Sequence, residues 1–129
     1  MRRGGFCRVY VEHAWYSGPD AGVADVDGAP HYFRRAYDPA HPDDDRYLVW
    51  PVDAETLALE REWWRIYVSW HGEPHPATGK ERYDELAVLL APHHTPPVDA
   101  KILFAEVQLS EQELRYGPDG PDYLMKWRT

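Results

Sequence analysis

The sequence contains little cysteine and no long apolar run, and both absences narrow the class of protein. Cys7 is the one cysteine among 129 residues, so an internal disulfide framework is excluded. No apolar run approaches the roughly 20 residues needed to cross a bilayer, and no signal-peptide-like apolar segment follows Met1-Arg2-Arg3. We therefore expect a protein of the reducing cytoplasm with no membrane segment.

The motifs of several common enzyme classes are also missing. The chain has no Gly-x-Ser-x-Gly nucleophile elbow and no glycine-rich phosphate loop. Its formal net charge is −8, and an acidic surface repels phosphate backbones, so we expect no nucleic-acid partner. This negative charge is compatible with a protein partner that has a basic surface, although a negative charge can also serve solubility alone. Nothing in the sequence indicates a cofactor.

Aromatic residues are abundant, with six tryptophans and nine tyrosines. Each such ring buries on the order of 150–250 Å², so the chain can build a sizeable core. A length of 129 residues most simply forms one domain, from residue 1 to residue 129, and we find no internal repeat or linker.

Alternating apolar and polar residues predict strands over 6–15, 22–27, 30–37, 47–51 and 100–109. Asp27-Gly28 separates the second and third of these and predicts a tight hairpin. The last segment places four apolar side chains on one face and is the best candidate for a central strand. Cys7 falls on the apolar face of the first strand, where we expect a buried, inert thiol.

Two helices are predicted between the fourth and fifth strands. Asp53 is the expected N-cap of a helix over 56–71, and Thr78-Gly79-Lys80-Glu81 has the form of a capping box that starts a second helix, which ends at Pro92. The order ββββααβ predicts an α+β fold, with a mainly antiparallel sheet of about five strands and both helices on one face. Residues 110–116 could form one helical turn, and 117–129 could extend as a C-terminal tail.

The long helix is apolar around more of its circumference than a surface helix requires. One stripe is expected to be core, whereas a second either packs against the other helix or forms a binding face. The first contains Leu59, Trp63, Ile66, Tyr67 and Trp70, and the second contains Leu57, Trp64 and Val68, with Glu60 between them.

The candidate binding site follows one line of this helix, formed by Glu60, Trp64, Tyr67 and His71. If that line faces a cavity, burial would raise the pKa of Glu60 and make it a general acid or base, with Tyr67 as a hydrogen-bond donor. Alternatively, Glu60 lies at the margin of the helix, solvated or paired with an arginine of Arg34-Arg35. His31, beside the hairpin, could project toward the same pocket or bond a turn carbonyl.

Four histidines in the connecting segments are weak candidates for a metal site. They are His71, His75, His93 and His94. The zincin spacing is absent, which favours loop histidines without a metal. The acidic run 43–45 lacks the spacing of a calcium loop and is expected to be solvated.

One segment resembles a known group of proteins. Residues 22–33, Gly-Val-Ala-Asp-Val-Asp-Gly-Ala-Pro-His-Tyr-Phe, are followed by Trp50-Pro51-Val52 and the tryptophan-rich helix. This pattern resembles a group of short bacterial proteins without an assigned activity, over roughly the first seventy residues. The resemblance implies a bacterial cytoplasmic protein and transfers no site residue.

Two functional hypotheses follow from the sequence. The first is a small, acidic, non-catalytic protein-interaction module of the immunity or accessory type, because tryptophan and tyrosine dominate binding hot spots. The alternative is a small-molecule-binding protein or small enzyme with an aromatic pocket between the sheet and the long helix, using Glu60, Tyr67, His71 and His31 as its polar groups.

Overall fold

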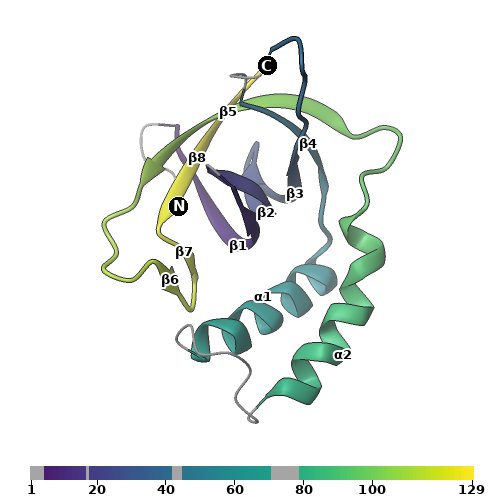
Figure 1. Cartoon of the computed structure of the whole chain (residues 1–129), viewed down its shortest axis with the longest axis vertical. Coiled ribbons are helices and arrows are strands. Elements are labelled where there is room, and N and C mark those ends of the chain that lie inside the picture. The colour runs from purple at the N-terminus through teal and green to yellow at the C-terminus, as the bar shows by residue number, and fades with distance from the viewer. Residues whose placement is uncertain (1–4, 17, 42–44, 71–78) are drawn as a thin grey trace.

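The computed structural model describes residues 5–16, 18–41, 45–70 and 79–129, and within them six antiparallel strands pair into a closed barrel. The strand order around the barrel is β1-β2-β3-β4-β5-β8 (Figure 1). A separate two-stranded sheet pairs β6 with β7. The bounds are β1 Cys7–Trp15, β2 Pro19–Val26, β3 Ala29–Arg35, β4 Arg46–Pro51, β5 Lys101–Leu109, β6 Tyr116–Gly117, β7 Gly120–Pro121 and β8 Tyr123–Arg128.

The predicted α+β class with an antiparallel sheet and two helices is confirmed, but the expected sheet of about five strands is wrong. The sequence suggested that 117–129 could be a tail, whereas β8 within it pairs with both β1 and β5. This pairing closes the sheet, and closure leaves no edge strand with unpaired backbone groups.

The Asp27-Gly28 hairpin is confirmed. Val26 pairs with Ala29 across it, and the two turn residues have φ values of 53° and 80°. Positive φ at both central residues is the signature of a type I′ turn, which matches the twist of the flanking strands.

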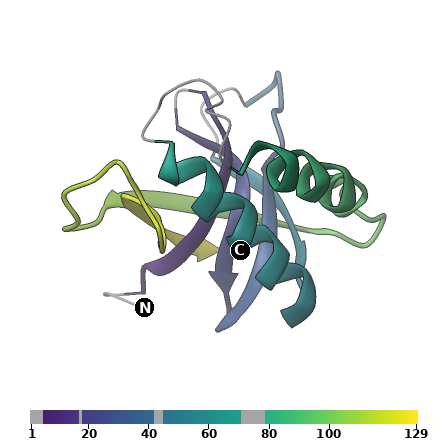
Figure 2. The same ribbon diagram turned by 90° about the horizontal axis from the view of Figure 1, so that it is seen from below.

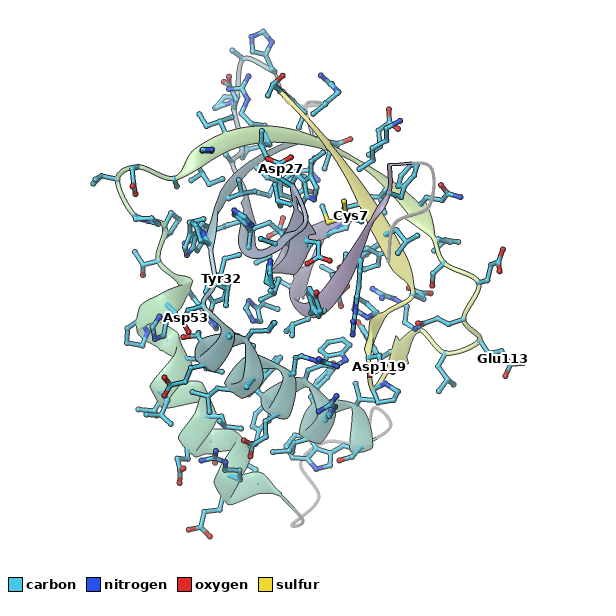
Figure 3. All side chains as sticks on the ribbon, turned by 180° about the vertical axis from the view of Figure 1, so that it is seen from behind. Cys7, Asp27, Tyr32, Asp53, Glu113 and Asp119 are labelled. Carbon is cyan, nitrogen blue, oxygen red and sulfur yellow. The ribbon has the colours of Figure 1, made fainter. Side chains whose placement is uncertain are left out.

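The barrel separates two apolar clusters, because neighbouring residues on a strand point to opposite faces. On β3, Phe33 joins a cluster with residues of all six barrel strands, which therefore fills the interior, whereas Tyr32 joins the cluster between the outer face of β1–β4 and the first helix. Cys7 is buried, as expected (Figure 3).

Helix α1, Ala54–Ser69, lies against one side of the barrel, and α2, Lys80–Leu90, packs beside it (Figures 1 and 2). The Asp53 cap is confirmed, since Asp53 Oδ1 accepts the Thr56 backbone N–H at 2.7 Å. Thr78, the first residue of the expected capping box, lies outside the described residues; the N-cap of α2 is Gly79, with a left-handed φ of 83°. A short 3-10 turn, η1, covers Ala91–His94.

The face of α1 turned toward the barrel differs from the one expected. Thr56, Glu60 and Trp64 are its buried residues. The stripe predicted as core is half-buried, apart from buried Trp70. Part of this stripe meets α2, where Trp63 stacks with Tyr83 at 5.3 Å between ring centroids, while the Glu60 line meets the barrel.

The other departures lie near the C-terminus. Strand β5 lies between β4 and β8, but Val107 and Leu109 near its C-terminal end are 40% and 70% exposed. The helical turn expected over 110–116 does not form. Neither described helix is long and apolar enough to span a bilayer.

Candidate functional site

Glu60 lies at the centre of a polar cluster between α1 and the barrel. Its side chain is fully buried. One carboxylate oxygen, Oε1, accepts the Nε2–H of His13 from β1 at 2.8 Å. The other, Oε2, accepts the Tyr32 hydroxyl from β3 at 2.6 Å and the Nε2–H of His94 from η1 at 2.6 Å. Three elements, β1, β3 and η1, therefore converge on the one carboxylate that α1 supplies.

These donors reverse the effect of burial on Glu60. Burial alone would raise the pKa of the Glu60 carboxyl, but the hydrogen bonds from His13, His94 and Tyr32 lower that pKa to about 2. The expected raised pKa is therefore wrong, and Glu60 is an anion at neutral pH. Burial and the neighbouring Glu60 charge raise the pKa of Tyr32, so its phenol remains a hydrogen-bond donor.

Aromatic packing holds both histidines in place. The His13 and His94 rings lie 4.1 Å apart between centroids, and His13 also meets the Trp63 ring edge-on at 5.7 Å. Trp50 Nε1 donates to the carbonyl oxygen of His93 at 3.1 Å, which anchors the turn that carries His94. The imidazoles are thus fixed by the fold rather than carried on a free loop.

The cluster has the donor set of a transition-metal site. The ligand atoms of His13, Glu60 and His94 lie within 4.8 Å of one another. Two imidazole nitrogens and one carboxylate oxygen occur in catalytic zinc sites and in other metal centres. Bonds of about 2.0–2.1 Å in a tetrahedral arrangement separate neighbouring ligand atoms by about 3.3 Å. Since His13 and His94 lie 2.8 and 2.6 Å from the carboxylate, small ring movements would admit an ion.

An open pocket of about 390 Å³ adjoins the cluster. Exposure increases from buried Glu60 to His13 and His94, whose side chains are 15% and 36% exposed, so the site opens on the histidine side. Figure 3 shows Tyr32 on the side of the barrel that faces the start of α1, near Asp53. The lining residues include His13, Asp20, Tyr32, Arg34, Arg35, Trp50 and His94.

Of the four candidate metal histidines, the structure describes two, His93 and His94. His94 belongs to the cluster, whereas the neighbouring His93 is exposed and contributes its backbone carbonyl to Trp50. His71 and His75 lie outside the described residues. One of the four predicted ligands is therefore in the observed donor set.

The remaining candidates lie elsewhere. Trp64 is buried, and its Nε1 donates to the Gly117 carbonyl at 2.7 Å, which ties α1 to β6. Tyr67 stacks on Trp63, with ring centroids 5.9 Å apart. His31 Nδ1 bonds the Ala29 carbonyl at 2.8 Å, matching the turn alternative. None of these three side chains is among those lining the pocket beside Glu60.

Sequence reasoning missed His13 and Tyr32. Alternation gives no dependable signal for His13, because the register of β1 shifts between Val9 and Val11 and again between Glu12 and Ala14. In addition, His13 is 47 residues from Glu60, and Tyr32 is 28 residues away. Neither contact follows from a local pattern, and helical spacing predicts Tyr67 as the hydrogen-bond donor, whereas the observed donor is Tyr32 on β3.

A second buried carboxylate, Glu12, belongs to a structural network. Arg115 donates to Glu12 Oε1 at 2.9 Å and the Tyr123 hydroxyl donates to it at 3.0 Å. The Arg115 guanidinium also lies 4.5 Å from the ring centres of Trp15 and Tyr116. These contacts fasten the segment before β6 to the barrel.

Comparison with protein-family models, with curated proteins and with solved structures finds no match for this chain.

Proposed function

We propose that this chain binds a divalent transition-metal ion through His13, Glu60 and His94, and that the adjoining pocket brings a small molecule to that ion. The observation that carries the proposal is the convergence of two imidazole nitrogens on one fully buried carboxylate beside an open pocket. This proposal extends the small-molecule hypothesis drawn from the sequence and makes His13 and His94 the partners of Glu60.

The number of ligands supports a reactive site over a structural one. Structural zinc sites use four protein ligands, whereas catalytic sites use three and leave a position for water or substrate. Within the described ranges, His13, Glu60 and His94 are the one group of potential ligand side chains with suitable spacing. The pocket lies on the side where a fourth ligand would enter.

The net charge of the site and the hydrogen bond from Tyr32 to Glu60 also favour a metal ion between the two histidines and Glu60. A divalent cation with one carboxylate and two neutral imidazoles keeps a net positive charge, and such an ion polarises a bound oxygen ligand. Tyr32 donates to the same carboxylate, which is the role of the outer hydrogen bonds that orient metal ligands.

The proposal is tested by titrating the chelator-treated chain with Co²⁺ and Zn²⁺, using calorimetry and the visible absorption of Co²⁺. We expect one ion per chain, with affinity at least about 100-fold lower for His13→Ala and His94→Ala, since each removes one of three ligands. His93→Ala is the matched control, because it changes an exposed imidazole one residue from His94 and leaves the carbonyl that binds Trp50.

Equal affinity in the His94→Ala and His93→Ala variants would refute the proposal, as would absence of binding to the unaltered chain at millimolar ion. Near-ultraviolet circular dichroism of each variant establishes that the aromatic core is retained, so loss of binding is separated from loss of folding.

The protein-interaction role stays a separate prediction. Exposed apolar side chains on α2 and before β5 favour it, with exposures of 75% for Val88, 50% for Leu89 and 109% for Val98. Retention of a partner by the unaltered chain but not by Leu89→Glu, in a pull-down from a bacterial lysate, would support this role.

A further inference from the structure

We infer that the small molecule brought to the metal carries an oxyanion, a carboxylate or a phosphate group, and that Arg34 binds this group. The inference rests on the proposed function, because it names the class of ligand for the same site.

Strand geometry places Arg34 next to the metal-binding cluster. Arg34 follows Tyr32 by two residues on β3, so both side chains leave the same outer face, with Cα atoms about 6.6–6.8 Å apart. The Tyr32 hydroxyl touches Glu60, and both Tyr32 and Arg34 line the pocket that contains His13 and His94. A ligand bound to the ion would therefore lie within reach of the Arg34 guanidinium.

The positions opposite Arg34 leave its side chain accessible from the pocket. Arg34 pairs with Ala21 on β2, whose methyl group is too short to cover a guanidinium, and with Leu48 on β4, which offers no charge. Arg34 is also exposed to solvent. Its donors can therefore turn toward a bound molecule.

Within the described part of the protein, no acidic side chain pairs with the Arg34 guanidinium. Arg35 pairs with Asp45 at 3.2 Å and Arg46 pairs with Asp38 at 3.1 Å. By contrast, the Arg34 side chain makes no hydrogen bond or ion pair with any described residue. An unpaired guanidinium presents a planar set of donors that matches a carboxylate or phosphate.

The other charges around the pocket limit the ligand to one anionic group. Asp20 also lines the pocket and forms no ion pair with Arg34 there, so it would repel a second anionic group. A volume of about 390 Å³ suits a small molecule, and Trp50 gives it an aromatic wall. A cationic ligand would be repelled by both the ion and Arg34.

The test measures anion binding to the Co²⁺-loaded full chain at constant ionic strength. Inorganic phosphate and acetate are titrated separately, and the Co²⁺ absorption spectrum and calorimetry report binding. Arg34→Gln removes the charge, Arg34→Lys keeps it without the planar donors, and Arg65→Gln is the control. Arg65 is an exposed arginine on α1 whose partner is Asp119, outside this pocket.

We expect at least one of the two anions to bind the unaltered chain. Arg34→Gln should bind it about 10-fold or more weakly, because it loses a charge-assisted hydrogen bond. Arg34→Lys should fall between, and Arg65→Gln should match the unaltered chain. The anion with the larger loss identifies the group that Arg34 recognises.

Two failures can be told apart. If Co²⁺ binds but Arg34→Gln binds both anions as tightly as the unaltered chain, the assignment of Arg34 is overturned and the metal site stands. If the spectrum shows no bound Co²⁺ in the unaltered chain, the metal site and the oxyanion ligand are both overturned.

Discussion

Replacing Glu60 by glutamine tests whether the buried carboxylate organises the contact between α1 and the barrel. The variant keeps the size of the side chain but removes the charge that three donors share: His13, Tyr32 and His94. Glutamine offers one acceptor oxygen, and its NH₂ group meets at least one of these donors instead of accepting from it.

The size of the effect follows from those contacts. Hydrogen bonds to a charged group contribute about 1.5–3 kcal/mol each and neutral ones about 0.5–1.5 kcal/mol, while the variant avoids the cost of burying a charge. We expect a net loss of about 3 kcal/mol in the free energy of unfolding. For a chain of this length, that loss corresponds to a fall in Tm of about 10 °C.

The assay is urea unfolding followed by tryptophan fluorescence, with a chelator present so that no metal ion contributes. Glu62→Gln is the matched control, since it makes the same chemical change on the same helix. Glu62 is 43% exposed where it pairs with Arg82, so its loss should cost less than about 1 kcal/mol.

The reasoning is refuted if Glu60→Gln unfolds within about 0.5 kcal/mol of the unaltered chain, which is the range of ordinary surface substitutions. It is also refuted if Glu60→Gln and Glu62→Gln lose equal stability, since burial and three donors are what distinguish the two carboxylates.

Two further predictions concern the barrel. Gly22→Ala should lower the free energy of unfolding by about 3 kcal/mol, because the added Cβ would overlap the Val11 carbonyl oxygen and press on the Phe33 ring; unchanged urea unfolding would contradict this. Tyr47 should make the protein sensitive to alkali: burial raises its pKa from 10.0 to about 12, so the stability it contributes is present below pH 10 and is lost as pH rises toward 12. That loss reaches about 2–3 kcal/mol. Unfolding free energies measured from pH 9 to 11.5 should fall less steeply for Tyr47→Phe, and parallel curves would rule out the assignment.

The candidate site shows how far a local pattern reaches. Glu60 stands out in the sequence because it interrupts an apolar helix, and that feature identified the centre of the site. Its partners come from β1, β3 and η1, and helical spacing can propose only residues of the same helix. For this reason the sequence named Tyr67 and His71, whereas the structure places Tyr32, His13 and His94 around the carboxylate.

The sequence by itself determined the local structure, because turns, caps and alternation depend on near neighbours. Asp27-Gly28 specified the hairpin, Asp53 capped α1, and alternation located β1 to β5. Only the tertiary structure decided that β8 closes a barrel, that the Glu60 line of α1 faces it, and that Glu60 stays ionised. Those outcomes depend on strand closure and on hydrogen bonds between residues far apart in the chain. The same buried carboxylate would have a raised pKa without its three donors and has a lowered one with them.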